Sequence, residues 1–89
     1  MILPTIHLNG TDPQALREGY VAAAEAVRAA ISALEAVPLN GRDYYPQGDA
    51  AYGVAFREHG NRVWALTEVY REMHQIIDHI DEAIEARRR

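Results

Sequence analysis

The segment whose residue types are best suited to chemistry is residues 38–48, which reads PLNGRDYYPQG. It concentrates polar and aromatic side chains: Arg42, Asp43, Tyr44, Tyr45 and Gln47. Tyrosine and arginine dominate binding hot spots, and arginine can hold a phosphate or a carboxylate with two parallel hydrogen bonds. We therefore predict that these five residues bind a ligand or a partner. The alternative is that the tyrosines cap the end of a helical core while Arg42 and Asp43 are solvated.

Side chains suited to catalysis are scarce elsewhere. The chain has no cysteine, and the aliphatic hydroxyls of the predicted helix interiors, Ser32 and Thr67, have no histidine at a suitable spacing. No glycine-rich phosphate loop is present. We expect a protein that is not an enzyme and has no catalytic residue.

His74 and Asp78 are spaced i, i+4, with Asp81 close behind, a spacing that can place two metal ligands on one helix face. The chain lacks a His-Glu-x-x-His motif and a second helix rich in ligands. We therefore predict a solvated face with no metal and no cofactor. His59 falls among apolar positions, where we expect a polar core residue bonded to the opposite helix.

The elements that must position these residues are all helical. Residues 1–10 form an apolar arm in which Pro4 allows only an extended segment or an edge strand. Residues 11–37 predict a helix capped by Thr11 or by Asp12, and residues 49–88 predict a longer one with Asp49 as its N-cap. Residues 38–48 connect them. The predicted fold is an all-α, antiparallel two-helix hairpin with an extended N-terminal arm.

Both helices carry apolar residues at alternating steps of four and three, the spacing of a coiled coil. In the first helix the predicted seam is Leu16, Tyr20, Ala23, Val27, Ala30, Leu34 and Val37. In the second it is Tyr52, Phe56, His59, Val63, Leu66, Tyr70, Met73, Ile77, Ile80 and Ile84. Trp64 and Val54 fall outside the second seam.

The unequal helix lengths predict a partner. Paired outward from the connection, the shorter helix runs out near residues 73–75 of the longer one. The apolar residues beyond that point must be covered by the arm or by a second chain, because their burial is strongly favourable. We expect the hairpin to form a homo-oligomer, most simply a dimeric four-helix bundle. The predicted interface residues are Ile76, Ile77, Ile80, Ile84 and Trp64.

Composition narrows the function classes. The chain has 89 residues, room for one domain over 1–89, and a formal net charge of −4. All nine of its cations are arginine. An acidic protein repels phosphate backbones, so we expect no general nucleic-acid binding. The chain has neither a long apolar run nor a basic stripe, so we expect no membrane partner. Residues 1–8 are too short for a signal peptide and are interrupted by Pro4. We expect an intracellular protein.

Two segments carry a family resemblance: LPTIHLNGT at residues 3–11, and NGRDYYPQG at residues 40–48 before the long helix. With the order of elements, they resemble small helical-hairpin proteins of tailed bacteriophages and prophages. The resemblance implies a location in the bacterial cytoplasm or the virion. It implies an accessory protein that binds a host factor or sequesters a nucleotide defence signal, or else a structural or assembly component of the particle. In a nucleotide site, Arg42 would hold a phosphate, Tyr44 and Tyr45 would stack, and Gln47 would contact a base or ribose edge.

Overall fold

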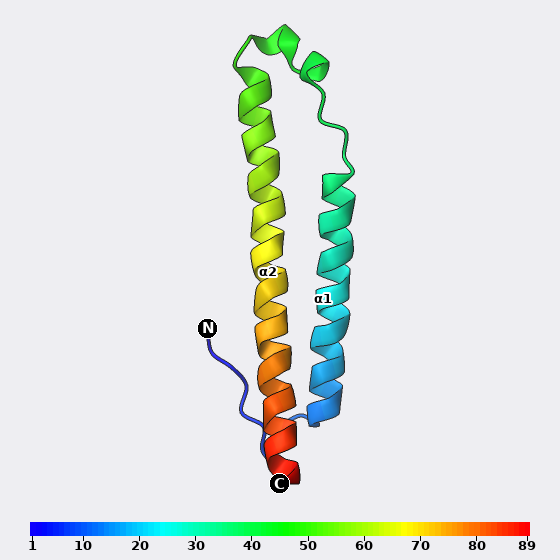
Figure 1. Ribbon diagram of the computed structural model, residues 1–89, viewed down its shortest axis with the longest axis vertical. Coiled ribbons are helices and arrows are strands. Elements are labelled where there is room, and N and C mark those ends of the chain that lie inside the picture. Colours follow the sequence, from blue (N-terminus) through cyan, green and yellow to red (C-terminus); the bar gives the residue numbers. More distant parts are fainter.

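Two long helices lie side by side and antiparallel in the computed structural model, which describes residues 1–89 (Figure 1). Helix α1 spans Pro13–Glu35 and helix α2 spans Ala51–Arg88. Two single-turn 3-10 helices lie between them, η1 at Gly41–Asp43 and η2 at Tyr45–Gln47. There is no strand, and the molecule measures 63 × 20 × 20 Å. The predicted all-helical hairpin is confirmed. Neither helix has a segment long and apolar enough to cross a membrane.

The helix ends follow capping chemistry at α1 and differ from prediction at α2. Of the two predicted caps for α1, Asp12 is the N-cap: its carboxylate accepts a hydrogen bond of 3.0 Å from the backbone N–H of Ala15, and Pro13 occupies the first helical position. At α2 the prediction of Asp49 as N-cap is wrong, because the helix begins after Ala50 with no side-chain cap.

The contact face of α2 is close to the predicted seam, whereas that of α1 is shifted. Every predicted seam residue of α2 is at least half-buried except Phe56. Ala23 and Ala30 of α1 are exposed, as is Val37 just beyond its end, whereas Ala24 is buried and Ile31 is half-buried. Helix α1 is so rich in alanine that two adjacent stripes fit the same spacing. The stripe found in the structure includes Ile31, whose larger apolar side chain gains more from burial than an alanine does.

The register of the two helices differs from the expected one. Arg17 pairs with Asp81 through Nε and Oδ1 at 2.5 Å. Pro13 and Ile84 line one hollow between the helices. Helix α1 therefore starts level with the C-terminal end of α2. Counting eighteen residues from the ion pair along each helix, the last residue of α1 lies at the level of Val63. The unpaired end of α2 is thus residues 51–62, next to the connection. We call residues 51–62 the overhang.

The path of the connection explains this shift. The chain between the helices, residues 36–50, first runs extended and then makes the two 3-10 turns, so it spans the length that α1 leaves free (Figure 1). A tight turn would have kept the two helices level at that end. The expectation that the shorter helix runs out near residues 73–75 is therefore wrong.

The arm covers the opposite end of α2. It runs alongside the C-terminal part of that helix and then crosses to the start of α1 (Figure 1). The ring nitrogen Nε2 of His79 lies 2.7 Å from the backbone oxygen of Pro4. Pro4 and Ile6 are half-buried, while Ile2 and Leu8 point into solvent.

The isoleucine cluster is therefore buried within one chain. Ile76, Ile77 and Ile80 are buried, Ile80 completely, and Ile84 is half-buried. Ala24 of α1 is the fourth and last buried residue. We expected either the arm or a second chain to cover these residues. In the structure the arm covers them, together with α1 of the same molecule. These three isoleucines have little surface left for a second copy, whereas Trp64 is 66% exposed.

Replacing Ile80 by alanine tests this core. Ile80→Ala leaves a cavity at a fully enclosed position, so we expect the free energy of unfolding to fall by about 2–5 kcal/mol. The matched control is Ile2→Ala, at a position 95% exposed, which should change it by less than about 0.5 kcal/mol. Urea unfolding at one fixed protein concentration measures both. Equal effects would contradict the placement of the core.

Candidate binding site at the loop end

A row of aromatic rings holds the connection against the overhang. Tyr52 of α2 lies between Tyr44 and Phe56, with ring centroids 6.2 and 6.1 Å away and both pairs tilted. The Tyr52 hydroxyl donates a hydrogen bond of 3.3 Å to the backbone oxygen of Leu39. Tilted rings at these separations attract each other beyond their buried area. Tyr52 thus anchors both the extended and the helical part of the connection.

Gly48 makes the final turn into α2. Its φ of 114° and ψ of 165° lie in a region that L side chains rarely adopt. It is the one residue of the chain with a positive φ. Its N–H donates to the carbonyl of Tyr45, and its own carbonyl accepts from Ala51. The glycine therefore fixes the angle at which η2 meets the first turn of α2.

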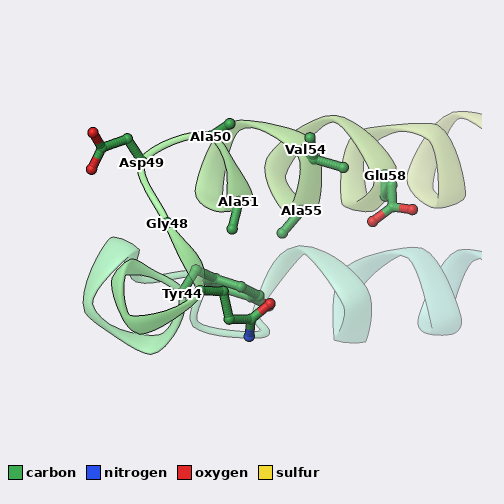
Figure 2. A pocket seen from close by; sticks show the side chains of 9 residues that line it. Tyr44, Gly48, Asp49, Ala50, Ala51, Val54, Ala55 and Glu58 are labelled. Atoms are coloured by element: carbon green, nitrogen blue, oxygen red, sulfur yellow. The ribbon is translucent and has the colours of Figure 1, made fainter.

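A hollow of about 480 Å³ lies between this turn and the overhang (Figure 2). It is lined by Tyr44, Gln47, Gly48, Asp49, Ala50, Ala51, Val54, Ala55 and Glu58. Ala51 and Ala55 point from α2 toward the side of Tyr44, while Asp49 points away from the helix at the outer edge of the turn (Figure 2). The hollow thus has an apolar wall, one tyrosine ring and the Glu58 carboxylate at its far end.

The structure divides the five predicted binding residues. Tyr44 and Gln47 line the hollow. Arg42, Asp43 and Tyr45 do not, and all three are exposed, Tyr45 by 72%. Arg42 and Asp43 form no ion pair. Tyr44 packs on the core end while Arg42 and Asp43 are solvated, as the alternative predicts for these three residues, whereas Tyr45 does not cap the core. Binding by these residues stays a prediction.

The electrostatics of the hollow are acidic. Its charged side chains are the carboxylates of Asp49 and Glu58, and it contains no arginine. Neither carboxylate forms an ion pair within the chain. The arrangement is suited to a cationic group beside an apolar one, and it opposes a phosphate.

Sequence reasoning missed the exposure of Phe56 on the overhang. Phe56 is 62% exposed because α1 ends before it reaches this residue, whereas Val54, which the sequence places outside the seam, is 43% exposed. Phe56 follows the heptad spacing, so its type and position indicate a core residue. The signal that could have revealed it is Gly53 and Gly60, two glycines inside one helix, each of which disfavours the helix by about 1 kcal/mol relative to alanine.

The histidines and aspartates near the other end make structural contacts, of which the one from Asp81 joins the two helices. The ring of His74 lies edge-on to Tyr70, with centroids 4.6 Å apart. Asp81 receives hydrogen bonds from Arg17, and this bonding raises the pKa of the Arg17 guanidinium above its already high ordinary value. No three side chains among His, Asp and Glu converge in a way that could hold a metal ion. His59 is half-buried and forms no side-chain hydrogen bond, so the expected bond to the opposite helix is absent.

Two glycine substitutions test the geometry of the turn. Gly48→Ala forces a side chain into a positive φ, so we expect it to lower the free energy of unfolding by more than about 1 kcal/mol. Gly19→Ala in α1 meets open space and should raise that free energy by about 0.5–1 kcal/mol. Thermal or urea unfolding would show the opposite signs. Two changes of the same sign would contradict the described turn.

The loop end of the rod therefore carries a hollow with a mixed apolar and acidic lining. No protein-family model, no curated protein and no solved structure matches this chain. The functional argument accordingly depends on the chemistry of this loop end and of the overhang.

Proposed function

We propose that the protein is a non-catalytic phage or prophage accessory protein that binds a segment of a host or phage protein at its loop end. The observation that carries the proposal is the hollow of about 480 Å³ with its apolar wall and its unpaired Glu58 carboxylate. The resemblance of residues 3–11 and 40–48 supports the phage or prophage origin. We place the protein in the bacterial cytoplasm on the same ground.

The chemistry of the hollow defines the partner segment. Tyr44 and Val54 offer an aromatic and an aliphatic surface, which favour an apolar side chain. Glu58 at the end of the same hollow favours arginine or lysine, because these residues form charge-assisted hydrogen bonds with a carboxylate. We therefore infer that the partner presents a basic residue next to an apolar one.

A nucleotide ligand receives less support from the geometry. Its phosphate would need Arg42, which lies outside the hollow, and the carboxylates inside would repel it. Tyr44 and Tyr45 also do not lie together, since Tyr44 packs on Tyr52 while Tyr45 is exposed. The protein partner is therefore the favoured one of the two.

A structural or assembly component of a phage particle is the second candidate. Its support is the shape of the chain, a rod of 63 Å with only four buried residues, which offers side surfaces along its length. Such a component would co-sediment with particles from infected cells, whereas a cytoplasmic binding protein would stay in the supernatant.

Selection of displayed random peptides tests the favoured proposal. We expect the immobilised protein to enrich peptides with arginine or lysine next to an apolar residue. Glu58→Lys should lose these peptides, because the charge at the end of the hollow is reversed. Glu72→Lys, an equally exposed change on α2 outside the hollow, is the matched control and should keep them.

Two results would contradict the proposal. One is a peptide selection that enriches sequences without a basic residue, or sequences that Glu58→Lys retains as well as the wild type does. The other is micromolar binding of a nucleotide in calorimetric titration with a panel of cyclic and linear nucleotides, lost in Arg42→Ala. That result would assign the loop end to a nucleotide signal instead.

A further inference from the structure

One face of α2 is exposed to solvent near the loop end. Its members lie at steps of three and four residues: Gly53, Phe56, Gly60, Trp64 and Thr67. At about 100° per residue, they fall within about 80° of the helix circumference. We call these five residues the Gly60 face. It includes no charged side chain over about four turns.

The aromatic residues of the Gly60 face are unusually exposed. Phe56 is 62% and Trp64 is 66% exposed, and they lie one helical turn on either side of Gly60. Aromatic side chains of this size dominate the energetics of interfaces. Thr67 adds no unpaired hydroxyl, because its Oγ1 donates to the backbone oxygen of Val63 at 2.8 Å.

The two glycines have no role inside the hairpin. A Cβ atom built on Gly53 or on Gly60 would meet nothing within 4 Å, so no neighbour in this chain requires a glycine at either position. Both have negative φ, so the backbone does not require one either. What a glycine offers at an exposed helical position is close approach by another backbone.

The order of the residues is the same in both directions from Gly60: an aromatic residue four positions away, then a small residue three positions further. A two-fold axis through Gly60 would therefore place Phe56 against Trp64 of a second copy and Gly53 against Thr67 of that copy. Self-complementarity of this kind is what an interface between two identical chains requires. The same operation brings Asp49, just before α2, toward the basic Arg71 of the other copy.

The surface area of the chain also favours a second copy as the partner of this face. A compact folded protein of 10.0 kDa exposes about 5,200 Å², and this chain exposes 6551 Å². The excess is about 1,300 Å². A standard protein interface buries about 800 Å² on each partner. Gly53, Phe56 and Gly60 lie on the overhang, where α2 has no helix of its own chain opposite, and Trp64 and Thr67 follow just beyond it.

We propose that two copies of the chain form a dimer through the Gly60 face, with the two α2 helices crossing antiparallel at Gly60. Gly60 supplies the close approach, and Phe56 and Trp64 supply the buried surface on either side. The dimer leaves the isoleucine cluster inside each chain. It does not depend on the proposed binding at the loop end.

Molar mass in solution, with matched glycine substitutions, tests the dimer. Sedimentation equilibrium should give twice 10.0 kDa for the wild type at micromolar concentration and 10.0 kDa for Gly60→Leu. Gly19→Leu, the same change at an equally open helical glycine of α1, is the control and should stay dimeric. Circular dichroism should show unchanged helix content in both variants, because neither Cβ meets a neighbour.

Trp64, the one tryptophan of the chain, gives a second measurement. Its emission should shift to shorter wavelength as the wild type is concentrated, and it should not shift in Gly60→Leu. Phe56→Ala should weaken the dimer by at least about thirtyfold, the loss typical of a hot-spot residue. Glu58→Lys, which lies outside the Gly60 face, should leave the dimer intact and thereby separates this proposal from the one at the loop end.

Cysteine cross-linking tests the direction of the helices, since the chain has no cysteine of its own. A mixture of Gly53→Cys and Thr67→Cys should form a disulfide-linked dimer on mild oxidation, whereas either variant alone should not. Self-linking of Thr67→Cys would show a parallel arrangement and overturn the two-fold axis at Gly60. A wild type that stays at 10.0 kDa at about 100 µM, where a dimer with a dissociation constant of about 1 µM would be almost fully formed, would overturn the interface. A Gly60→Leu variant that remains dimeric would overturn it as well.

Discussion

The burial of three isoleucines near the C-terminal end of α2 is the constraint on which the rest of the structure depends. Ile76, Ile77 and Ile80 are three of the four buried residues in the chain. Helix α1 and the arm both converge on this end, which the Arg17–Asp81 ion pair and the contact between His79 and Pro4 mark on either side. Once α1 is drawn there, its last residue cannot reach the first three turns of α2. The overhang, the extended connection and the exposed Phe56 all follow from this register.

A core of four residues is small for a chain of 89. Domains of this size are marginal even when they are compact, and the net stability of a fold is a small difference between large terms. The radius of gyration, 19.3 Å, is well above the roughly 12 Å of a compact chain of this length. Long helices gain part of their stability from local hydrogen bonds, but an isolated pair has only one interface to bury. Most apolar side chains of the hairpin therefore keep some exposed surface, and the largest exposed ones on α2 are Phe56 and Trp64.

The sequence predicts the fold and the face of α2 because these depend on local pattern. In α2, large apolar residues at steps of four and three define a single apolar face. In α1 the many alanines allow two adjacent faces, and the structure uses the face that includes Ile31. The register between the helices could not be predicted, because it depends on how far residues 36–50 stretch. The consequence for the site is direct. Arg42 and Tyr45 carry suggestive chemistry but point into solvent, and Val54 and Glu58 look like ordinary helix residues until the connection folds beside them.

The hollow and the Gly60 face lie on different sides of the same stretch of α2. At about 100° per residue, Glu58 is about 160° around the helix from Gly60, so a copy seated at Gly60 would leave the hollow open. An antiparallel dimer would then carry two hollows related by its two-fold axis. A partner that presents two binding segments would gain an effective concentration at the second site without any new contact. The overhang thus unites the two proposals: the register leaves α2 without α1 beside it at this end, and one side of the helix would then take a second copy while the other, beside the connection, would take a partner.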